Sequence, residues 1–366
     1  MNIKVWAGVI ALSLASIIPA AASPTLTVIQ KFDGTNGATG DDPNAMILAS
    51  DGNFYGITYL HIGTVFKVTP GGQFTTIFSL PPNNPNRFFY GDFFTGIVEG
   101  PDGFLYVTVR GSNNNPNPMV FRISKSGTDF QVMLNFAPLA LSVASDGNFY
   151  GTTGGIGTGV VFRLSTSGTY TVLSTNSGGM LVESLNKQAT DGNFYGTCYS
   201  SWWHVCRVST SGQVTPIFEY PTGTNGRSPA NGILTQGSDG LLYGVAVGGS
   251  GATASVVFQL STSGSYQELY QTGYCTPKSG CPMVLPASDG NLWIADPPAD
   301  SVYSVTTSGV LLETVSFSSQ PNPYAHPQLL VQAPSGILFG TTGEPNPAYN
   351  APGSVFSINA GLPPPR

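Results

Sequence analysis

The sequence has 366 residues, of which 41% are apolar and only 9% are charged, with 46 glycines and 29 prolines. This composition supplies enough apolar material for a core and excludes an intrinsically disordered chain. The 13 basic residues form no cluster and 19 acidic residues bring the net charge to −6. Nucleic acid is therefore disfavoured as a partner, because phosphate binding needs a concentrated positive surface.

Residues 1–22 are predicted to be a secretory signal peptide. Lys4 supplies the positive start, and Val5 to Ile18 is an apolar stretch too short to span a bilayer comfortably. Ala20 to Ala22 provides small residues for cleavage near Ala22/Ser23. We therefore expect residues 23–366 to form a single exported domain, periplasmic or extracellular, without a membrane span.

A sequence motif, Asp-Gly-Asn-Phe-Tyr-Gly-Thr-Thr at 146–153, recurs in related form every 44 to 51 residues. A period of this length indicates one supersecondary unit copied around a closed or stacked array. The Asp-Gly pair is typical of a hairpin turn, where Asp is favoured for backbone reasons, so we interpret the repeated carboxylates as turn residues. The seven copies begin at Asp51, Asp102, Asp146, Asp191, Asp239, Asp289 and Ser335.

Each copy is predicted to form a four-stranded antiparallel blade of a β-propeller. In residues 229–271 the strands are expected near 233–236, 241–247, 256–260 and 266–271. Four short strands in one repeat match the size of a propeller blade. Large aromatic residues recur in the second and third strands, and we expect them to fill the space between neighbouring blades.

The two ends of the chain are predicted to share the seventh blade. The last copy has three strands and then reaches three prolines, 363–365, which lack the N–H groups of a fourth strand. Residues 25–32 match the fourth strands of other copies, such as 74–78. The prediction is a seven-bladed, all-β propeller closed by strand 25–32, since closure removes open sheet edges.

The repeats resemble the GloVer tandem-repeat family of exported bacterial proteins. The resemblance rests on residues 146–153, on Gly-Thr-Val-Phe-Lys-Val at 63–68 and on Ser-Thr-Ser-Gly at 209–212, and it covers essentially the whole mature chain. It implies an exported propeller-like protein, often with a C-terminal surface anchor, and it implies no activity. This chain departs from that pattern because it ends in Leu-Pro-Pro-Pro-Arg without an apolar tail.

The four cysteines form two local pairs, Cys198 with Cys206 and Cys275 with Cys281. Disulfides are expected in an oxidising compartment, and neither spacing resembles a zinc site. We expect no cofactor. A calcium loop at 33–42 is conceivable, but it lacks the spacing and the terminal Glu of known calcium loops.

Two aromatic segments are candidates for ligand binding, because both fall on the irregular loops at one rim of the ring. The first is Arg87, Phe88, Phe89 and Tyr90, and the second is Trp202, Trp203 and His204. Exposed aromatic residues bind sugar rings or anchor proteins. The alternative is that they pack over the rim or against the next blade.

A second set of candidates lies on the first strand of each blade, which lines the central channel. These residues could hold a polar ligand or only water, and they are Glu99, Lys187, Gln188, Gln236, Gln332 and, at the mouth, His326. The sequence contains no nucleophile elbow, zinc or Walker motif.

Two functions therefore remain open. The first is a monomeric, non-catalytic propeller that binds a carbohydrate or a protein through its loop rim. The alternative is a hydrolase or lyase acting on a polar small molecule at the channel mouth, with Glu99, Lys187 and His326 as its candidate residues.

Overall fold

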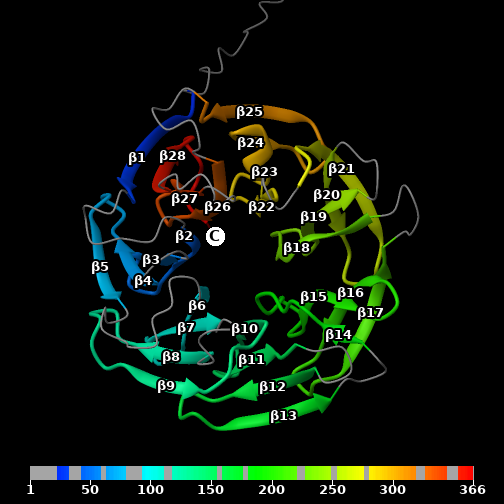
Figure 1. Cartoon of the computed structure of the whole chain (residues 1–366). Helices are drawn as coiled ribbons and strands as arrows, with labels where there is room; N and C mark the ends of the chain where they lie inside the picture. Colours follow the sequence, from blue (N-terminus) through cyan, green and yellow to red (C-terminus); the bar gives the residue numbers. More distant parts are fainter. Residues whose placement is uncertain are drawn as a thin grey trace, which may run out of the picture.

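The computed structural model contains seven four-stranded antiparallel sheets arranged around a central channel (Figure 1). This confirms the predicted seven-bladed propeller. The structure describes residues 23–32, 43–58, 63–79, 93–110, 118–154, 159–175, 180–220, 227–248, 254–275, 280–318, 326–343 and 353–365. The predicted signal peptide, calcium loop and segment 87–90 lie outside these residues.

Blades one to four follow each other along the chain, and each runs from the channel outwards. Blade one consists of β2 (Pro43–Leu48), β3 (Phe54–Thr58), β4 (Thr64–Val68) and β5 (Phe74–Ser79). Blade two consists of β6 (Phe93–Glu99), β7 (Leu105–Arg110), β8 (Met119–Ile123) and β9 (Gln131–Leu134). Blade three consists of β10 (Ala140–Val143), β11 (Phe149–Thr152), β12 (Val160–Leu164) and β13 (Tyr170–Thr175). Blade four consists of β14 (Leu181–Val182), β15 (Phe194–Tyr199), β16 (Trp203–Val208) and β17 (Val214–Glu219).

Blades five to seven complete the ring. Blade five consists of β18 (Arg227–Gln236), β19 (Leu242–Gly248), β20 (Ser255–Leu260) and β21 (Tyr266–Thr272). Blade six consists of β22 (Met283–Pro286), β23 (Leu292–Asp296), β24 (Ser301–Val305) and β25 (Leu311–Ser316), with the short 3-10 helix η2 (Pro297–Ala299) between β23 and β24. Blade seven consists of β26 (His326–Gln332), β27 (Leu338–Gly343), β28 (Ser354–Asn359) and β1 (Thr25–Lys31).

The N-terminal strand closes the ring as the sequence predicted. β1 pairs with β28 in an antiparallel register from Thr25 opposite Asn359 to Lys31 opposite Ser354. Phe32 follows β1 and is fully buried, with its ring 5.4 Å from that of Phe66 in blade one. The N-terminal segment therefore completes one sheet and packs against the next.

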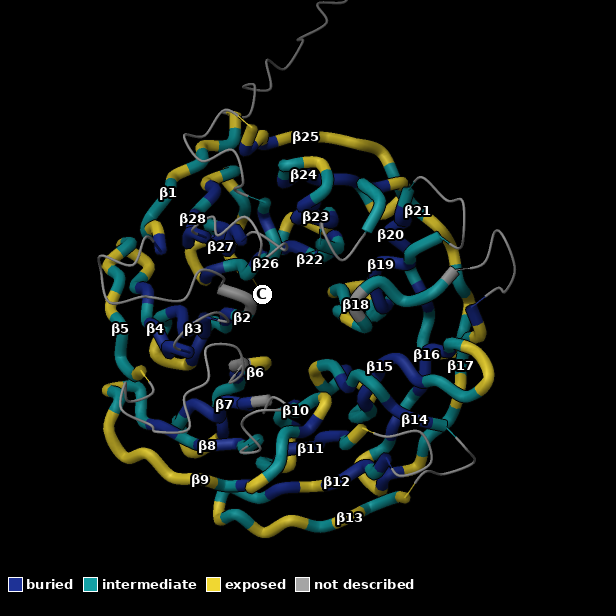
Figure 2. Tube along the Cα trace, viewed as in Figure 1, coloured by how far each residue is buried: buried dark blue, intermediate teal, exposed yellow. Residues whose placement is uncertain are grey.

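The core lies between the faces of neighbouring blades. Figure 2 shows that the middle strands are mostly buried and that the outermost strands carry most of the exposed residues. The repeated aromatic residues fill the core, and both Tyr55 and Phe66 have no exposed surface. Gly56 lies directly under the Phe66 ring, and a Cβ atom there would come within 2.2 Å of it. Gly56 is thus required by packing.

The repeated Asp-Gly pairs form turns, as expected. In blade one Gly52 has φ +77°, and the Asp51 carboxylate accepts a hydrogen bond of 2.9 Å from the Tyr55 hydroxyl. Burial, the hydrogen bond and the nearby carboxylate raise the pKa of the equivalent Tyr150 to about 12. The same Asp–Tyr bond recurs in the next four blades, at Tyr106, Tyr150, Tyr195 and Tyr243.

The alternating strand directions divide the connections between two rims. We call the side that carries the turns after the first and third strands of each blade the turn rim. The opposite side carries the other connections, and we call it the loop rim. No helix among the described residues is long and apolar enough to cross a bilayer.

Candidate functional site

Three glutamines predicted to face the channel instead join neighbouring blades at the turn rim. Gln236, the last residue of β18, accepts a hydrogen bond of 2.9 Å from the N–H of Thr190 in the preceding blade, and it donates to the Gly240 carbonyl in its own turn. Equivalent bonds from the preceding blade reach the side-chain oxygens of Gln188 (2.7 Å, from Ser145) and Gln332 (3.0 Å, from Ser288). We call each of these contacts a latch.

Glu99 is the latch of blade two and carries a charge. Its carboxylate accepts hydrogen bonds of 2.6 Å from both the N–H and the hydroxyl of Ser50, and it forms an ion pair of 2.5 Å with Lys125. Partial burial on its own would raise the pKa of Glu99. The hydrogen bonds from Lys125 and Ser50 outweigh that effect and lower the pKa of the carboxyl below its usual value. Glu99 is therefore engaged in holding two blades together.

The other boundaries between neighbouring blades, which we call seams, lack a latch for reasons visible in the sequence. Pro101 and Pro334 occupy the donor position in two turns, and proline has no N–H to donate. The residues opposite them in the next blade are apolar, Val143 and Leu48. At the seam between blades five and six Ser238 supplies a donor, but Pro286 stands at the acceptor position. Four seams thus have both a donor and an acceptor, two have neither, and one has a donor alone. Donor and acceptor therefore match across six of seven seams, and comparison of adjacent repeats in the sequence could have revealed this match.

The three residues proposed for catalysis are not brought together. Glu99 ends β6 at the turn rim, whereas His326 begins β26 at the loop rim. A seven-residue strand spans roughly 20 Å, so the two groups lie near opposite ends of the channel. Lys187 is exposed and precedes the latch residue Gln188.

At the loop rim, the hairpin between β15 and β16 presents an exposed indole. Trp202 is 52% exposed, whereas Trp203 is half-buried and packs edge-to-face on Tyr199 with ring centroids 5.2 Å apart. The N–H of Ser200 donates to the Trp202 carbonyl at 3.1 Å and closes the turn. Of the predicted pair, Trp202 is the more exposed side chain.

His204 supports this hairpin from below. Its ring is buried, its Nδ1 lies 3.0 Å from the Trp202 carbonyl, and its Nε2 lies 3.6 Å from the Glu219 carboxylate. Because the partner of Nδ1 is a carbonyl oxygen, Nδ1 carries the proton and donates. His204 thus fixes the backbone of Trp202, and the ring itself has little surface for a ligand.

Both predicted disulfides are present. Cys198–Cys206 crosses the same hairpin, with 6.0 Å between the Cα atoms, and Cys275–Cys281 closes a loop at the loop rim of blade six, with 4.5 Å between them. Together with His204, the first disulfide makes the hairpin under Trp202 a rigid support.

A histidine–carboxylate pair lies at the loop rim between blades six and seven. His326 Nδ1 bonds to the Asp300 carboxylate and lies 3.1 Å from the Pro297 carbonyl. Both partners are acceptors, so Nδ1 carries the proton. Asp300 has φ +49° and follows η2, an arrangement that the sequence patterns did not indicate. The pair joins the innermost strand of blade seven to a connection of blade six.

A buried carboxyl supports that connection. Asp296 is 1% exposed and accepts hydrogen bonds from the Gly273 N–H at 2.9 Å and from the Tyr303 hydroxyl at 2.8 Å. Burial raises the pKa of Asp296, although both bonds favour its charged form. Its second oxygen is buried without a hydrogen-bond partner in the described part of the chain. The described residues contain no cluster of three or more His, Cys, Asp or Glu able to hold a metal ion.

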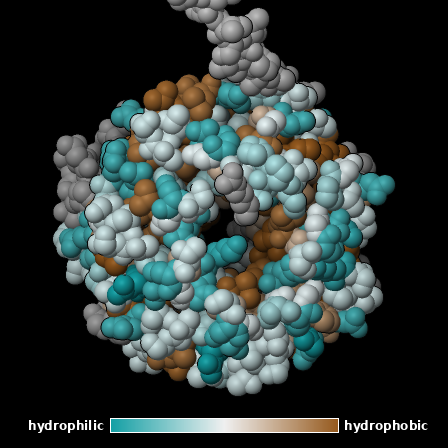
Figure 3. Space-filling view, turned by 180° about the vertical axis from the view of Figure 1, so that it is seen from behind, coloured by the Kyte–Doolittle hydropathy of each residue, from teal (hydrophilic) through white to brown (hydrophobic). Residues whose placement is uncertain are grey.

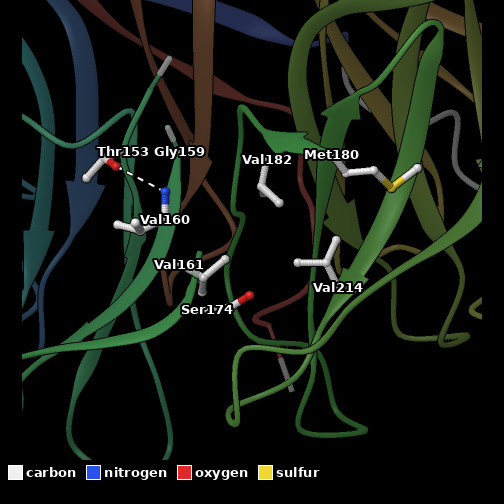
Figure 4. Close-up of a pocket in the computed structure, with 8 residues that line it drawn as sticks. All are labelled: Thr153, Gly159, Val160, Val161, Ser174, Met180, Val182 and Val214. Carbon is white, nitrogen blue, oxygen red and sulfur yellow. Dashed lines mark hydrogen bonds between the residues drawn. The ribbon is translucent and has the colours of Figure 1, made fainter. Parts of the chain in front are cut away.

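A narrow crevice between blades three and four is too small for a ligand. Figure 4 shows Val161, Val182, Met180 and Val214 lining it, with the hydrogen bond of 3.2 Å between Thr153 and Val160 beside it. Its volume is about 10 Å³, roughly the space that one water molecule needs. It is a packing gap of the blade seam.

No protein-family model matches the chain, and no curated protein matches it by sequence. Solved structures match over almost the full length. A streptogramin B lyase is 13% identical with a TM-score of 0.60, covering 92% of this chain and 97% of its own. Virginiamycin B lyase from Staphylococcus aureus is 15% identical with a TM-score of 0.61, covering 92% and 99%. A catalytically inactive form of that lyase with quinupristin is 17% identical with a TM-score of 0.60 and the same coverage. At these identities the similarity supports the propeller fold alone.

Proposed function

We propose that the protein is an exported, non-catalytic propeller of the GloVer type that binds a carbohydrate through the loop rim of blade four. The observation that carries the proposal is the exposed indole of Trp202 on a hairpin held by a disulfide, by His204 and by the Tyr199–Trp203 contact. Large exposed aromatic side chains on rigid supports are common anchors for ligands, because little conformational entropy is lost on binding.

Trp202→Ala tests this proposal without disturbing the fold. Binding of soluble oligosaccharides to the mature protein is measured by titration calorimetry, and the affinity of any oligosaccharide that binds should fall roughly tenfold. Trp203 is left in place, because its packing on Tyr199 would confuse a stability effect with a binding effect. Phe130→Ala is the control, since Phe130 is similarly exposed, at 46%, but lies beside the outer strand of blade two. Equal affinity of the Trp202 variant and the wild type would contradict the proposal.

The second candidate is a hydrolase or lyase at the channel mouth. The pair of His326 with Asp300 favours it, because a carboxylate that accepts a hydrogen bond from Nδ1 orients the imidazole and fixes its tautomer. Propellers of this shape include proteins named as lyases, which shows that the fold tolerates such chemistry.

His326→Gln is the test of this candidate. The mature protein is incubated with p-nitrophenyl esters and with quinupristin, and conversion is followed by absorbance and mass spectrometry. Conversion that His326→Gln reduces at least about 100-fold, and that His204→Gln leaves intact, would favour the enzyme. No conversion by the wild type would leave binding as the better account.

A further inference from the structure

Residues on or beside the innermost strands of blades two to five line a cavity in the channel wall. Its volume is about 310 Å³, at the lower end of the range for small-molecule sites. The lining residues of the inner wall, among them Ile97, Leu141 and Asn186, lie further from their turns than the latch residues do. The cavity therefore lies on the loop-rim side of the latches. Figure 3 shows the central opening from one side, with apolar surface along part of its wall.

Two large apolar side chains on this wall are left accessible. Leu139 is 47% exposed and Ile233 is 38% exposed, and they enter the cavity from blades three and five. Isolated exposed apolar residues are ordinary on an outer surface, but two that face one concave cavity provide a surface that a ligand could cover.

The position of Ile233 depends on a bulge that blade four holds in place. The pairing of β18 with β19 breaks between Pro229 and Leu234, and Gly232 there has φ +70°. The Gly232 carbonyl accepts hydrogen bonds from the Ser184 hydroxyl at 2.8 Å and from the Asn186 amide at 3.0 Å. The irregular strand is thus fixed by side chains of the preceding blade, and a bulge of this kind can redirect a side chain.

The polar groups of the cavity are neutral. Thr95, Ser184 and Asn186 contribute hydroxyl and amide groups, and none of the described residues that line the cavity is charged. Without a compensating charge, a charged ligand would lose its hydration without gaining an ion pair. An uncharged molecule with an apolar body can cover the aliphatic side chains and keep its polar groups hydrogen-bonded.

We propose that this cavity binds a small, uncharged, amphipathic molecule of one or two rings. The site uses residues of four blades and does not include Trp202 or His326. Binding here is therefore independent of the function proposed for the loop rim, and either proposal can fail without the other.

The test uses Prodan, an uncharged two-ring naphthalene dye whose emission shifts to the blue in apolar surroundings. The mature protein, residues 23–366, is titrated with the dye, and saturable binding is expected. Leu139→Trp fills the cavity and should weaken binding at least tenfold. Leu311→Trp is the matched control, because Leu311 is also 47% exposed but lies on β25 at the outside of blade six. The control should bind the dye like the wild type.

A second pair of variants tests the preference for an uncharged ligand. Leu139→Lys places a charge inside the cavity and should also weaken Prodan binding at least tenfold, whereas Leu311→Lys should leave it unchanged. Circular dichroism confirms that each variant is folded, and Ile233→Trp replaces any Leu139 variant that is not. Absence of saturable binding, or equal losses in the Leu139 and Leu311 variants, would overturn the proposal.

Discussion

The seam between blades four and five and the seam between blades seven and one are held by different means. The first is polar at both levels: Thr190 binds Gln236 at the turn rim, and Ser184 and Asn186 bind the Gly232 carbonyl deeper in the channel. The second has Pro334 opposite Leu48 and no latch.

The closing seam relies on apolar packing. The rings of Phe54 and Phe339 stack with centroids 4.2 Å apart, and Phe32 joins the same cluster from the N-terminal segment. The comparison indicates that polar contacts hold the seam between blades four and five, whereas closure of the ring depends on aromatic burial and on β1. Four predictions test this division, from the largest expected effect to the smallest.

Deletion of residues 25–32 should have the largest effect. It removes the fully buried Phe32 and leaves β28 without its outer neighbour. We expect a loss of about 5 kcal/mol or more, which is as large as the whole stability of many domains. Thermal unfolding of the purified protein measures it. A synthetic peptide of residues 23–32 should restore part of the stability, since a strand can be added in trans. An unchanged melting temperature would refute closure by β1.

Gly127→Ala should be the next most harmful change, because this turn of blade two touches the outer strand of blade one. A Cβ atom on Gly127 would come within 1.9 Å of the Ile77 carbonyl oxygen, and φ there is +83°. We expect a loss of about 3 kcal/mol in urea unfolding. Gly103→Ala is the control, since φ is +79° and no atom lies within 4 Å of its Cβ position. It should cost about 1 kcal/mol. Equal losses of unfolding free energy in the two variants would mean that the close approach of Gly127 to Ile77 adds nothing to the cost of the substitution.

Gln236→Leu should weaken a latched seam by about 1 kcal/mol, because it removes one acceptor and one donor at a site that water can reach. Chemical denaturation provides the measurement. The reverse change, Pro286→Gln, places a latch opposite Ser238 and should add up to about 1 kcal/mol. If Gln236→Leu left the free energy of unfolding unchanged, the latches would contribute nothing to stability.

Glu99→Gln should have the smallest effect at neutral pH, under about 1 kcal/mol, because glutamine serves as the latch in three other blades. Its effect should depend on pH. The folded-state pKa of Glu99 lies below the usual value of 4.5, so its contribution is present above that pH and is lost as the pH falls through the lower folded-state pKa. The variant should lose less stability than the wild type between neutral pH and pH about 3. Parallel stability curves would show that the Glu99 charge does not contribute.

The sequence predicted the blades, their number, the closing strand and both disulfides, because each depends on local patterns or on the repeat itself. The direction of the side chains on the innermost strands could not be predicted in the same way. Gln188 and Gln236 were placed in the channel because the strand lines it, but the turn of the preceding blade lies within hydrogen-bond reach and binds them. That contact joins residues more than forty positions apart and becomes visible only when adjacent repeats are compared.

The candidate sites were only partly accessible to sequence reasoning. Trp202 and Trp203 are adjacent and identical in type, yet strand pairing exposes one and packs the other on Tyr199. The partner of His326 comes from a different blade, after a short helix that no periodic pattern predicted. The cavity with Leu139 and Ile233 depends on the irregularity between Pro229 and Leu234 in β18, which is wider than the register shifts in the first strands of blades one, two and seven.

The pairing of β1 with β28 also constrains how the chain reaches its native state. Thr25 pairs with Asn359 across almost the full length of the chain. Forming this pair therefore carries the entropic cost of closing a very long loop in one late step. Blades one to six can form from local hairpins, but the seventh sheet must wait for both ends. Folding should therefore show a slow final phase in which β1 pairs with β28 of a nearly complete but open ring.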